Sequence, residues 1–243
     1  QDIDGEAAYD LSGYSISLSS DGATVAIGAK ANNYNMGHVR IYSYDGTNWQ
    51  QAGQDIDGEA FGDQSGYSVS LSSDGGVVAI GAYKNDGNGN DAGHVRIYEY
   101  ILGSWSQIGQ DIDGEAANNS SGYSVVLSSD GNIVAIGAPE NNGNGSKAGH
   151  VRIYNYNGST WNQLGGDIDG EAAGDWSGKS VSLSSDGLKI AIGAANNNGG
   201  GNGYRAGHVR IYNWDGFTWT QLGNDFDGEA SYDYSGHSIS LAS

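Results

Sequence analysis

The sequence contains no cysteine and only one proline among its 243 residues. Without cysteine the chain has neither a disulfide framework nor thiol chemistry, and its redox compartment is left open. Basic residues are also scarce, because 10 Lys and Arg stand against 29 Asp and Glu, which gives a formal charge of −19. Nucleic acid and anionic membrane surfaces both attract basic proteins, so we expect neither as a partner.

Long apolar runs and helical patterns are lacking too. No stretch of the sequence approaches the roughly 20 apolar residues that a membrane-spanning helix requires, so we predict no membrane span. No window carries an apolar stripe at a period of 3.6 residues between helix caps, which excludes a helical solenoid. Nucleophile elbows, phosphate-binding loops and zinc motifs are likewise missing from the sequence.

Most of the sequence consists of copies of one repeated unit. The segment Asp-Ile-Asp-Gly-Glu-Ala starts at Asp2, Asp55, Asp111 and Asp167, and a version with Phe in second place starts at Asp225. A fixed period of this length indicates a repeat architecture. We therefore predict one domain or domain fragment, 1–243, whose units cover approximately 2–54, 55–110, 111–166, 167–224 and, in part, 225–243.

Each unit predicts four short strands. In the second unit, residues 67–73 alternate apolar and small polar side chains, 77–82 are almost continuously apolar, 94–98 alternate again, and 105–112 follow a Gly-containing turn. Repeated four-stranded antiparallel units are the sequence signature of a β-propeller. The predicted fold is all-β, a propeller of four complete blades plus a partial fifth. A parallel β-helix, which would need shorter repeats, is a minor alternative.

Three segments of this unit, 65–71, 78–82 and 93–98, resemble the FG-GAP repeat of integrin α-subunit propellers and bacterial surface proteins, and the closing Gly-Ala-Pro of that repeat stands intact at 137–139. The whole unit is similar to tandem repeats of secreted proteins from marine microbes. The resemblance implies a β-propeller and a secreted or cell-surface setting in recognition or adhesion. Family members that bind calcium use a longer loop between the first two strands, so that calcium site does not carry over.

Strand order predicts one functional surface. In an up-and-down sheet, the loop between the second and third strands and the connection between units lie on the same rim. Both are acidic or rich in Asn and Gly, so we predict that this rim binds a glycan or an extracellular protein, with a cation as a possible aid. The ligand-rim candidates are Asn85, Asp86, Asn88, Asn141, Asn142 and Asn197.

The spacing Asp-x-Asp-Gly-Glu-x-x-x-Asp places several hard oxygen ligands near a glycine, which suits calcium. The metal candidates are Asp57, Glu59, Asp63, Asp169, Glu171 and Asp175. The alternative is structural: the carboxylates close turns and pair with once-per-unit arginines at blade boundaries, with histidines beside them. The candidates for these interblade contacts are Arg40, Arg96, Arg152, Arg210, His94 and His150. Calcium is the one cofactor that the pattern indicates.

The distribution of titratable residues bears on whether the protein is an enzyme. An active site needs an asymmetric set of groups around one reacting atom, whereas the titratable residues here recur almost identically in every unit, so we predict that the protein is not an enzyme.

The alternative function is a structural spacer or self-assembling array without a specific ligand. Ends that begin with a fourth strand and finish with a first strand, 238–242, allow three outcomes: truncation of a longer ring, closure with a defective blade, or a homo-oligomer formed through open blade edges.

Overall fold

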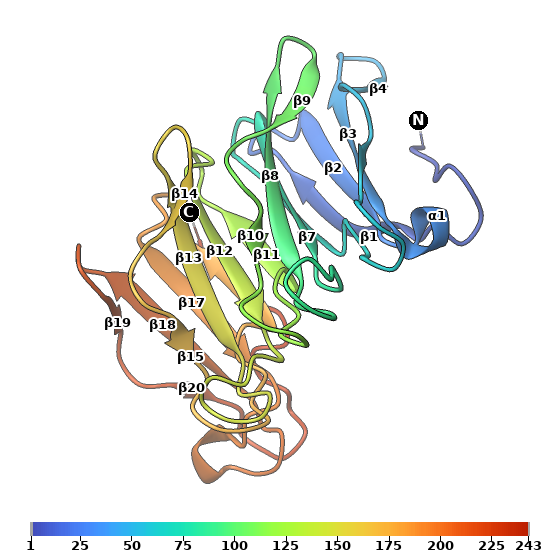
Figure 1. The fold of residues 1–243 in the computed structure, drawn as a ribbon. Helices are drawn as coiled ribbons and strands as arrows, with labels where there is room; N and C mark the ends of the chain where they lie inside the picture. Colours follow the sequence, from blue (N-terminus) through green and yellow to red (C-terminus); the bar gives the residue numbers. More distant parts are fainter. Residues whose placement is uncertain (1, 243) are drawn as a thin grey trace.

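The computed structural model describes residues 2–242 and contains four five-stranded sheets of the same topology. Figure 1 shows the sheets standing one after another in chain order, from the blue N-terminal sheet to the red C-terminal one. The first strands of all four sheets line one central hollow, to which Leu18, Leu71, Leu127 and Leu183 contribute. Radially arranged antiparallel sheets are the blades of a β-propeller, so the predicted fold is confirmed.

The strands follow the sequence pattern closely. Blade 1 contains β1 (Ser12–Leu18), β2 (Thr24–Ala29), β3 (His38–Tyr44), β4 (Trp49–Gln51) and β5 (Ile56–Asp57). Blade 2 contains β6 (Ser68–Leu71), β7 (Val77–Ala82), β8 (His94–Ile101), β9 (Ser104–Gln107) and β10 (Ile112–Asp113). Blade 3 contains β11 (Ser124–Leu127), β12 (Ile133–Ala138), β13 (His150–Tyr156), β14 (Trp161–Gln163) and β15 (Ile168–Asp169). Blade 4 contains β16 (Ser180–Leu183), β17 (Lys189–Ala194), β18 (His208–Trp214), β19 (Trp219–Gln221) and β20 (Phe226–Asp227).

The outer edge of each blade differs from the single fourth strand that the sequence predicts. In blade 2 both β9 and β10 pair with β8, β9 at its C-terminal half and β10 at its N-terminal half. The Ile108 N–H still donates to the Ile97 carbonyl oxygen in β8, and residues 109–111 then leave the ladder and turn the chain. The Asp-Ile-Asp segment that opens each sequence unit is therefore the last strand of the preceding sheet, and each blade is offset from its sequence unit by one short strand.

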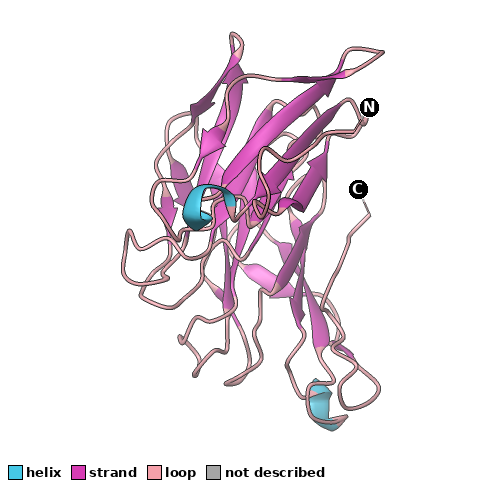
Figure 2. Ribbon diagram, turned by 90° about the vertical axis from the view of Figure 1, so that its right-hand side faces the viewer, coloured by secondary structure: helices cyan, strands magenta, loops and turns pink. Residues whose placement is uncertain are grey.

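Within residues 2–242, helical structure is confined to two short turns, both in loops between second and third strands (Figure 2). They are α1 (Asn32–Asn35) and the 3-10 turn η1 (Gly199–Gly201). Three consecutive residues of the first loop, Asn33 to Asn35, have positive φ angles, which for a residue such as Tyr34 is a strained conformation. Among residues 2–242 no helix is long and apolar enough to cross a membrane.

The core lies between blades rather than within one sheet. One face of blade 1, with Val39 and Ile41, packs against the opposite face of blade 2, with Val78 and Ile80, and all four side chains are fully buried. The second strands read as continuous apolar runs because both of their faces are covered in this way. Equivalent clusters join blade 2 to blade 3 and blade 3 to blade 4.

The recurring tryptophans belong to these boundaries. The indole N–H of Trp105 in blade 2 donates to the carbonyl oxygen of Ala52 in blade 1, at 2.7 Å. Trp161 and Trp219 make the same bond to the carbonyl oxygens of Ile108 and Leu164. Trp105 and Trp161 are buried, so the structure uses them as links between blades and leaves no face for stacking on a sugar.

The two chain ends lie outside the ladders. Residues 237–242 run beside β16, where the Leu241 backbone N–H bonds to the Ser182 hydroxyl, but they form no strand. The predicted partial fifth blade is therefore absent as a sheet among the described residues, because this segment finds no second strand to pair with. Residues 2–4, predicted as an outer strand, lie outside any strand as well.

Candidate functional site

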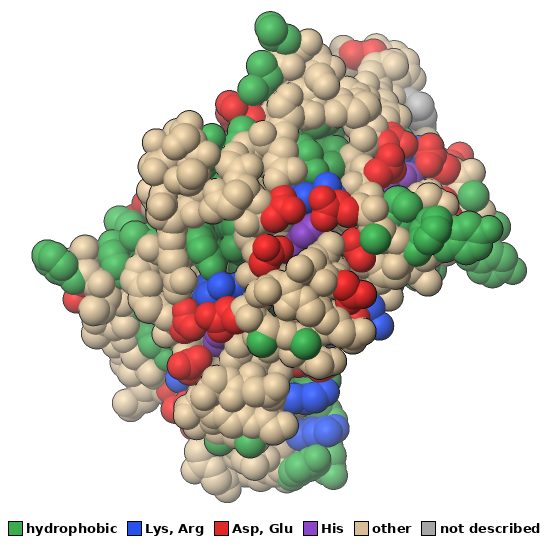
Figure 3. Space-filling view, in the orientation of Figure 1, with side chains coloured by type: hydrophobic (Ala, Val, Ile, Leu, Met, Phe, Trp, Pro, Cys, Tyr) green, Lys and Arg blue, Asp and Glu red, His purple; other side chains and the backbone are tan. Residues whose placement is uncertain are grey.

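We define the acidic rim as the four loops between second and third strands together with the segments that connect the blades. The loops cover 30–37, 83–93, 139–149 and 195–207, and the connecting segments cover 58–67, 114–123, 170–179 and 228–236. Each loop bonds to the connecting segment that follows it, as in the bridge between Gly93 and Ser121. Figure 3 shows carboxylates gathered around His and Arg side chains at several successive positions on one face of the molecule.

Buried asparagines hold these loops in shape. The Asn85 side-chain oxygen accepts from the Gly87 N–H at 2.8 Å, and its amide donates to the Asp63 carboxylate at 2.9 Å. Asn141 and Asn197 close the same turn in the next two loops. Three of the six predicted rim residues, Asn85, Asn141 and Asn197, are thus buried and bonded within the fold, whereas Asp86, Asn88 and Asn142 are exposed.

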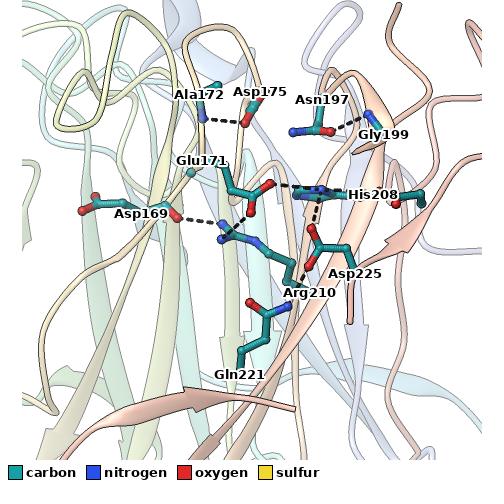
Figure 4. Close-up of polar contacts among 12 residues, drawn as sticks. Asp169, Glu171, Ala172, Asp175, Asn197, Gly199, His208, Arg210, Gln221 and Asp225 are labelled. Atoms are coloured by element: carbon teal, nitrogen blue, oxygen red, sulfur yellow. Dashed lines mark hydrogen bonds and ion pairs between the residues drawn. The ribbon is translucent and has the colours of Figure 1, made fainter. Parts of the chain in front are cut away.

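The predicted calcium ligands do not gather into one group. The Asp63 carboxylate is buried and accepts from the Ala60 N–H and the Asn85 amide, and burial raises its pKa. Asp175 accepts from the Ala172 N–H in the same way. Asp57 and Asp169 belong to the outer strands β5 and β15, and Figure 4 shows the Asp169 carboxylate pointing away from Glu171. A calcium site on these residues stays a prediction.

The recurring arginines link neighbouring blades through backbone. Nη2 of Arg96 in β8 donates to the carbonyl oxygen of Asp57 in β5, at 2.7 Å, while Nη1 lies 3.7 Å from the Glu59 carboxylate. Arg40, Arg152 and Arg210 bond equivalently to the carbonyl oxygens of Asp4, Asp113 and Asp169. The arginines therefore contact the main chain of an aspartate by a hydrogen bond, and Arg40, Arg96 and Arg210 lie near a glutamate carboxylate as well.

Four equivalent Glu–His–Asp sets are formed, three at the boundaries between blades and one between the N-terminal segment and blade 1, each with its ligand-type atoms within 4.8 Å of one another. The glutamate comes from the connecting segment, the histidine opens the third strand of a blade, and the aspartate precedes the last strand of that blade. The sets are Glu6–His38–Asp55, Glu59–His94–Asp111, Glu115–His150–Asp167 and Glu171–His208–Asp225. The structure therefore brings the predicted metal residues Glu59 and Glu171 beside histidines rather than beside their neighbouring aspartates.

The histidines of these sets are deeply buried. Burial, assisted by the guanidinium of Arg96, lowers the pKa of His94 to about 4, and burial with Arg152 does the same for His150. The pKa of His208 is lowered from the same cause. A neutral imidazole forms no ion pair. At neutral pH it therefore supplies no positive charge to the carboxylates that face its Nδ1 atom.

The set at the boundary of blades 3 and 4 is drawn in Figure 4. Nδ1 of His208 lies 3.7 Å from Glu171 and 3.5 Å from Asp225, beyond the usual range of a hydrogen bond. The side chain of His208 is 1% exposed, and neither of its ring nitrogens has a hydrogen-bond partner among residues 2–242. Buried polar atoms without partners are rare in folded proteins.

Exposed aromatic pairs occur at two positions on the rim, one after blade 1 and one after blade 4. Tyr34 and Phe61 make an edge-to-face contact with ring centroids 5.6 Å apart, and they are 81% and 68% exposed. Tyr204 and Tyr232 form a second pair of the same geometry. At the two positions between these pairs, which follow blades 2 and 3, Ala117 and Ala173 take the place of Phe61.

Sequence reasoning missed both features. The Glu–His–Asp sets join residues that are about 30 and 50 positions apart, and a spacing search within one short motif does not combine them. The signal that could have found them is the strict recurrence of one His in every unit at the start of the third strand. The aromatic pairs were visible only as unmatched residues, because their contact depends on how a loop folds against the next connecting segment.

Comparison with known proteins agrees with this architecture. Residues 56–98, which run from β5 to β8, match the sequence model of the FG-GAP repeat. These residues form an FG-GAP repeat. The resemblance given by the sequence is thereby confirmed, and the other blades carry the same strand pattern. No curated protein matches the chain.

Several solved structures share the fold of these repeats. A candidate 6-phosphogluconolactonase of Bacteroides uniformis matches with a TM-score of 0.61 at 13% identity, over 90% of this chain and 55% of its own. The periplasmic gluconolactonase PpgL of Pseudomonas aeruginosa matches with 0.56 at 17% identity, over 88% and 56%. TolB of Acinetobacter baumannii matches with 0.51 at 16% identity, over 89% and 43%. The chain thus spans about half the length of these proteins, and the likeness shows the fold alone.

The prediction that the protein is not an enzyme rested on the recurrence of its titratable residues in every unit. That prediction is wrong. Two of the similar propellers are named as lactonases, so this blade architecture also occurs in proteins that carry enzyme names. The physical reason is that loops from all blades converge around one axis. A few unmatched side chains are then enough to make a site asymmetric, even where the blades repeat almost unchanged.

Proposed function

We propose that this chain is a recognition module of a secreted or cell-surface protein and that its acidic rim binds a glycan. The observation that carries the proposal is the pair of exposed aromatic contacts, Tyr34 with Phe61 and Tyr204 with Tyr232, on rim loops. An aromatic ring supplies a large apolar face on which a sugar ring can stack, and neighbouring amides and carboxylates can accept and donate hydrogen bonds. The FG-GAP repeat supports the extracellular setting.

The charge of the rim narrows the class of glycan. Connecting segments carry glutamates in every copy, and the formal charge of the chain is −19. Sulfated or uronic-acid polymers would be repelled by this surface, so neutral glycans fit it better.

The backbone of Tyr34 is strained, with a φ angle of 59°. Its ring is 81% exposed in the loop that follows β2. Strain of this kind clusters at ligand-binding positions in folded proteins.

Binding of neutral and anionic glycans to an immobilised array, followed by calorimetry on any neutral ligand found, tests the proposal. Tyr34→Ala and Tyr204→Ala should each weaken binding about tenfold, which corresponds to about 1.4 kcal/mol. Phe217→Ala is the matched control, because Phe217 is at least as exposed as either tyrosine but lies in the hairpin between β18 and β19, on the opposite rim. A folded protein that binds no glycan, or equal losses in all three variants, would contradict the proposal.

Self-association is a second candidate, supported by a separate observation. Leu18, on the first strand of blade 1, is 58% exposed, whereas its equivalent Leu71 is 7% exposed against the preceding blade. Phe226, on the last strand of blade 4, is 59% exposed, whereas its equivalent Ile112 is buried against the following blade. The two exposed faces are therefore the two halves of a contact that the chain makes three times internally.

We propose that a second copy of this chain occupies these faces head to tail, and the packing of the equivalent faces at each internal boundary supports this. Sedimentation velocity over a concentration series should show a mass that increases with concentration. Leu18→Glu and Phe226→Asp should each shift the protein to a monomer. Leu102→Glu, at a fully exposed position in the turn between β8 and β9, should leave association unchanged. A monomer at every concentration would rule the second candidate out.

A further inference from the structure

We propose that each Glu–His–Asp set binds one divalent transition-metal cation of the zinc type. Three observations support this: the geometry of the ligand atoms, the partners that orient them, and a buried imidazole that lacks any other partner. The inference concerns different ligands from the calcium prediction made from the sequence, and it does not depend on glycan binding.

The spacing of the ligand atoms suits an ion shared between them. In the sets of His38, His150 and His208, Nδ1 lies 3.5 to 3.9 Å from both facing carboxylates. In the fourth set, Nδ1 of His94 lies 3.7 Å from Glu59. Ligand atoms that share a tetrahedral zinc ion, with bonds of about 2.0 to 2.2 Å, stand about 3.4 Å apart. The observed separations are longer than hydrogen bonds and close to those of ligands around one metal ion.

The carboxylates are oriented by further partners. In the sets of His94 and His150, the Oε2 atom that faces the imidazole also accepts from the Asn85 or Asn141 amide, at 3.4 and 3.3 Å. Nε2 of Gln221 donates to Oδ1 of Asp225 at 2.6 Å, which leaves Oδ2 facing His208. Nη1 of Arg210 lies 4.0 Å from Oε1 of Glu171, while Oε2 faces the same imidazole. Gln51, Gln107 and Gln163 hold the equivalent aspartates. Such outer partners fix metal ligands in proteins and raise the affinity of their sites.

His208 supplies the observation that points to a ligand. Its side chain is 1% exposed, its two ring nitrogens have no hydrogen-bond partner within residues 2–242, and Nδ1 is aimed at Glu171 and Asp225. Asp227 lies 4.0 Å from the same nitrogen. Three carboxylates against the guanidinium of Arg210 leave two negative charges in excess, which a divalent cation would neutralise.

The ligand types select the class of cation. Calcium and magnesium take oxygen ligands, and a buried imidazole offers them nothing. Imidazole nitrogen combined with carboxylate oxygen suits zinc and related ions, and the partly exposed Glu and Asp leave room for water to complete the coordination. The ion would join the connecting segment to the next blade, since the glutamate and the histidine come from these two elements.

Equilibrium dialysis of the whole chain against Zn²⁺, with the metal counted by mass spectrometry, tests the proposal. We expect four zinc ions per chain and three in Glu171→Gln. The matched control is Glu229→Gln: Glu229 is the fifth copy of this glutamate, is exposed, and belongs to none of the four sets. It should retain four ions. Circular dichroism and melting curves should show that both variants are folded.

Two further measurements examine the ligands directly. X-ray absorption of the loaded protein should report about one imidazole per zinc ion. Added Ca²⁺ at the same concentration should leave the zinc bound. No zinc uptake, an equal loss of zinc in Glu171→Gln and Glu229→Gln, a spectrum without imidazole, or displacement by Ca²⁺ would each overturn the proposal.

Discussion

The hydroxyl of Ser68 donates a 2.8 Å hydrogen bond to the carbonyl oxygen of Gly122, which lies 54 residues further along the chain. Ser15, Ser124 and Ser180 make the equivalent bond at the other positions. The second strand takes part in the same contact, because a Cβ atom on Gly81 would lie 2.2 Å from that carbonyl oxygen. Neighbouring blades are thus joined where a connecting backbone touches a strand backbone.

Gly81→Ala should destabilise the protein severely. The added methyl group meets the Gly122 backbone, which cannot move aside without parting two blades, so we expect a loss of about 3 kcal/mol or more in the free energy of unfolding. Urea denaturation followed by tryptophan fluorescence measures the loss. Gly166→Ala is the control, because a Cβ there meets nothing within 4 Å, and it should change stability by less than about 0.5 kcal/mol.

Trp105 should contribute through both its ring and its N–H group. Trp105→Phe leaves the buried carbonyl of Ala52 without its donor, so we expect a loss of about 1 to 3 kcal/mol. Trp105→Ala also opens a cavity between blades 1 and 2 and should cost about 3 to 5 kcal/mol. Thermal and urea unfolding measure both. If the two variants were equally stable, the ring would not be part of the boundary core.

Arg96→Gln should weaken the boundary between blades 1 and 2. The substitution removes a charged donor from the Asp57 carbonyl oxygen and leaves the nearby Glu59 carboxylate without its cation, so we expect a loss of about 1.5 to 3 kcal/mol. Lys189→Gln, at an exposed position at the start of β17, serves as the control and should stay within about 0.5 kcal/mol. Equal effects in the two variants would show that the carbonyl contact contributes nothing specific.

The contribution of Asp74 to the stability of the fold should depend on pH. Hydrogen bonds from the Ser72 hydroxyl and the Gly76 N–H hold the pKa of Asp74 below its ordinary value. A carboxyl with a depressed folded pKa stabilises the fold above its unfolded pKa of about 3.9, and this stability is lost as pH falls through the folded value. The stability difference between the wild type and Asp74→Asn should therefore be constant from about pH 5 to 7 and shrink below about pH 4. Urea unfolding across this range measures it, and a difference that stays constant in acid would contradict the prediction.

The fold was largely predictable because its determinants are local. The alternation in 67–73 and the apolar run 77–82 correspond to β6 and β7, and the Asp-Gly pair at 74–75 forms the turn between them. Repetition then specified the arrangement, since four copies of one unit must pack in four equivalent ways. The exception was the outer edge: nothing in the spacing of 105–112 shows that residues 109–111 leave the ladder.

The rim was predicted as a surface but not as a set of contacts. Sequence spacing grouped Asp57, Glu59 and Asp63, because they are neighbours along the chain. In the structure Asp63 closes a turn with Asn85, whereas Glu59 faces His94 from the next blade. Side chains a few residues apart in an irregular segment point in different directions, and only the packing of the segment against a neighbour decides which of them meet.

The sequence by itself therefore determined the repeat, the strands, the propeller and the side of it that carries the acids, because periodicity and turn chemistry act over a few residues. The tertiary structure decided which carboxylates surround each histidine, which tryptophans are buried, and which aromatic rings are exposed as pairs. Those outcomes depend on atoms that come together only when one blade packs on the next, across more than 50 residues of chain.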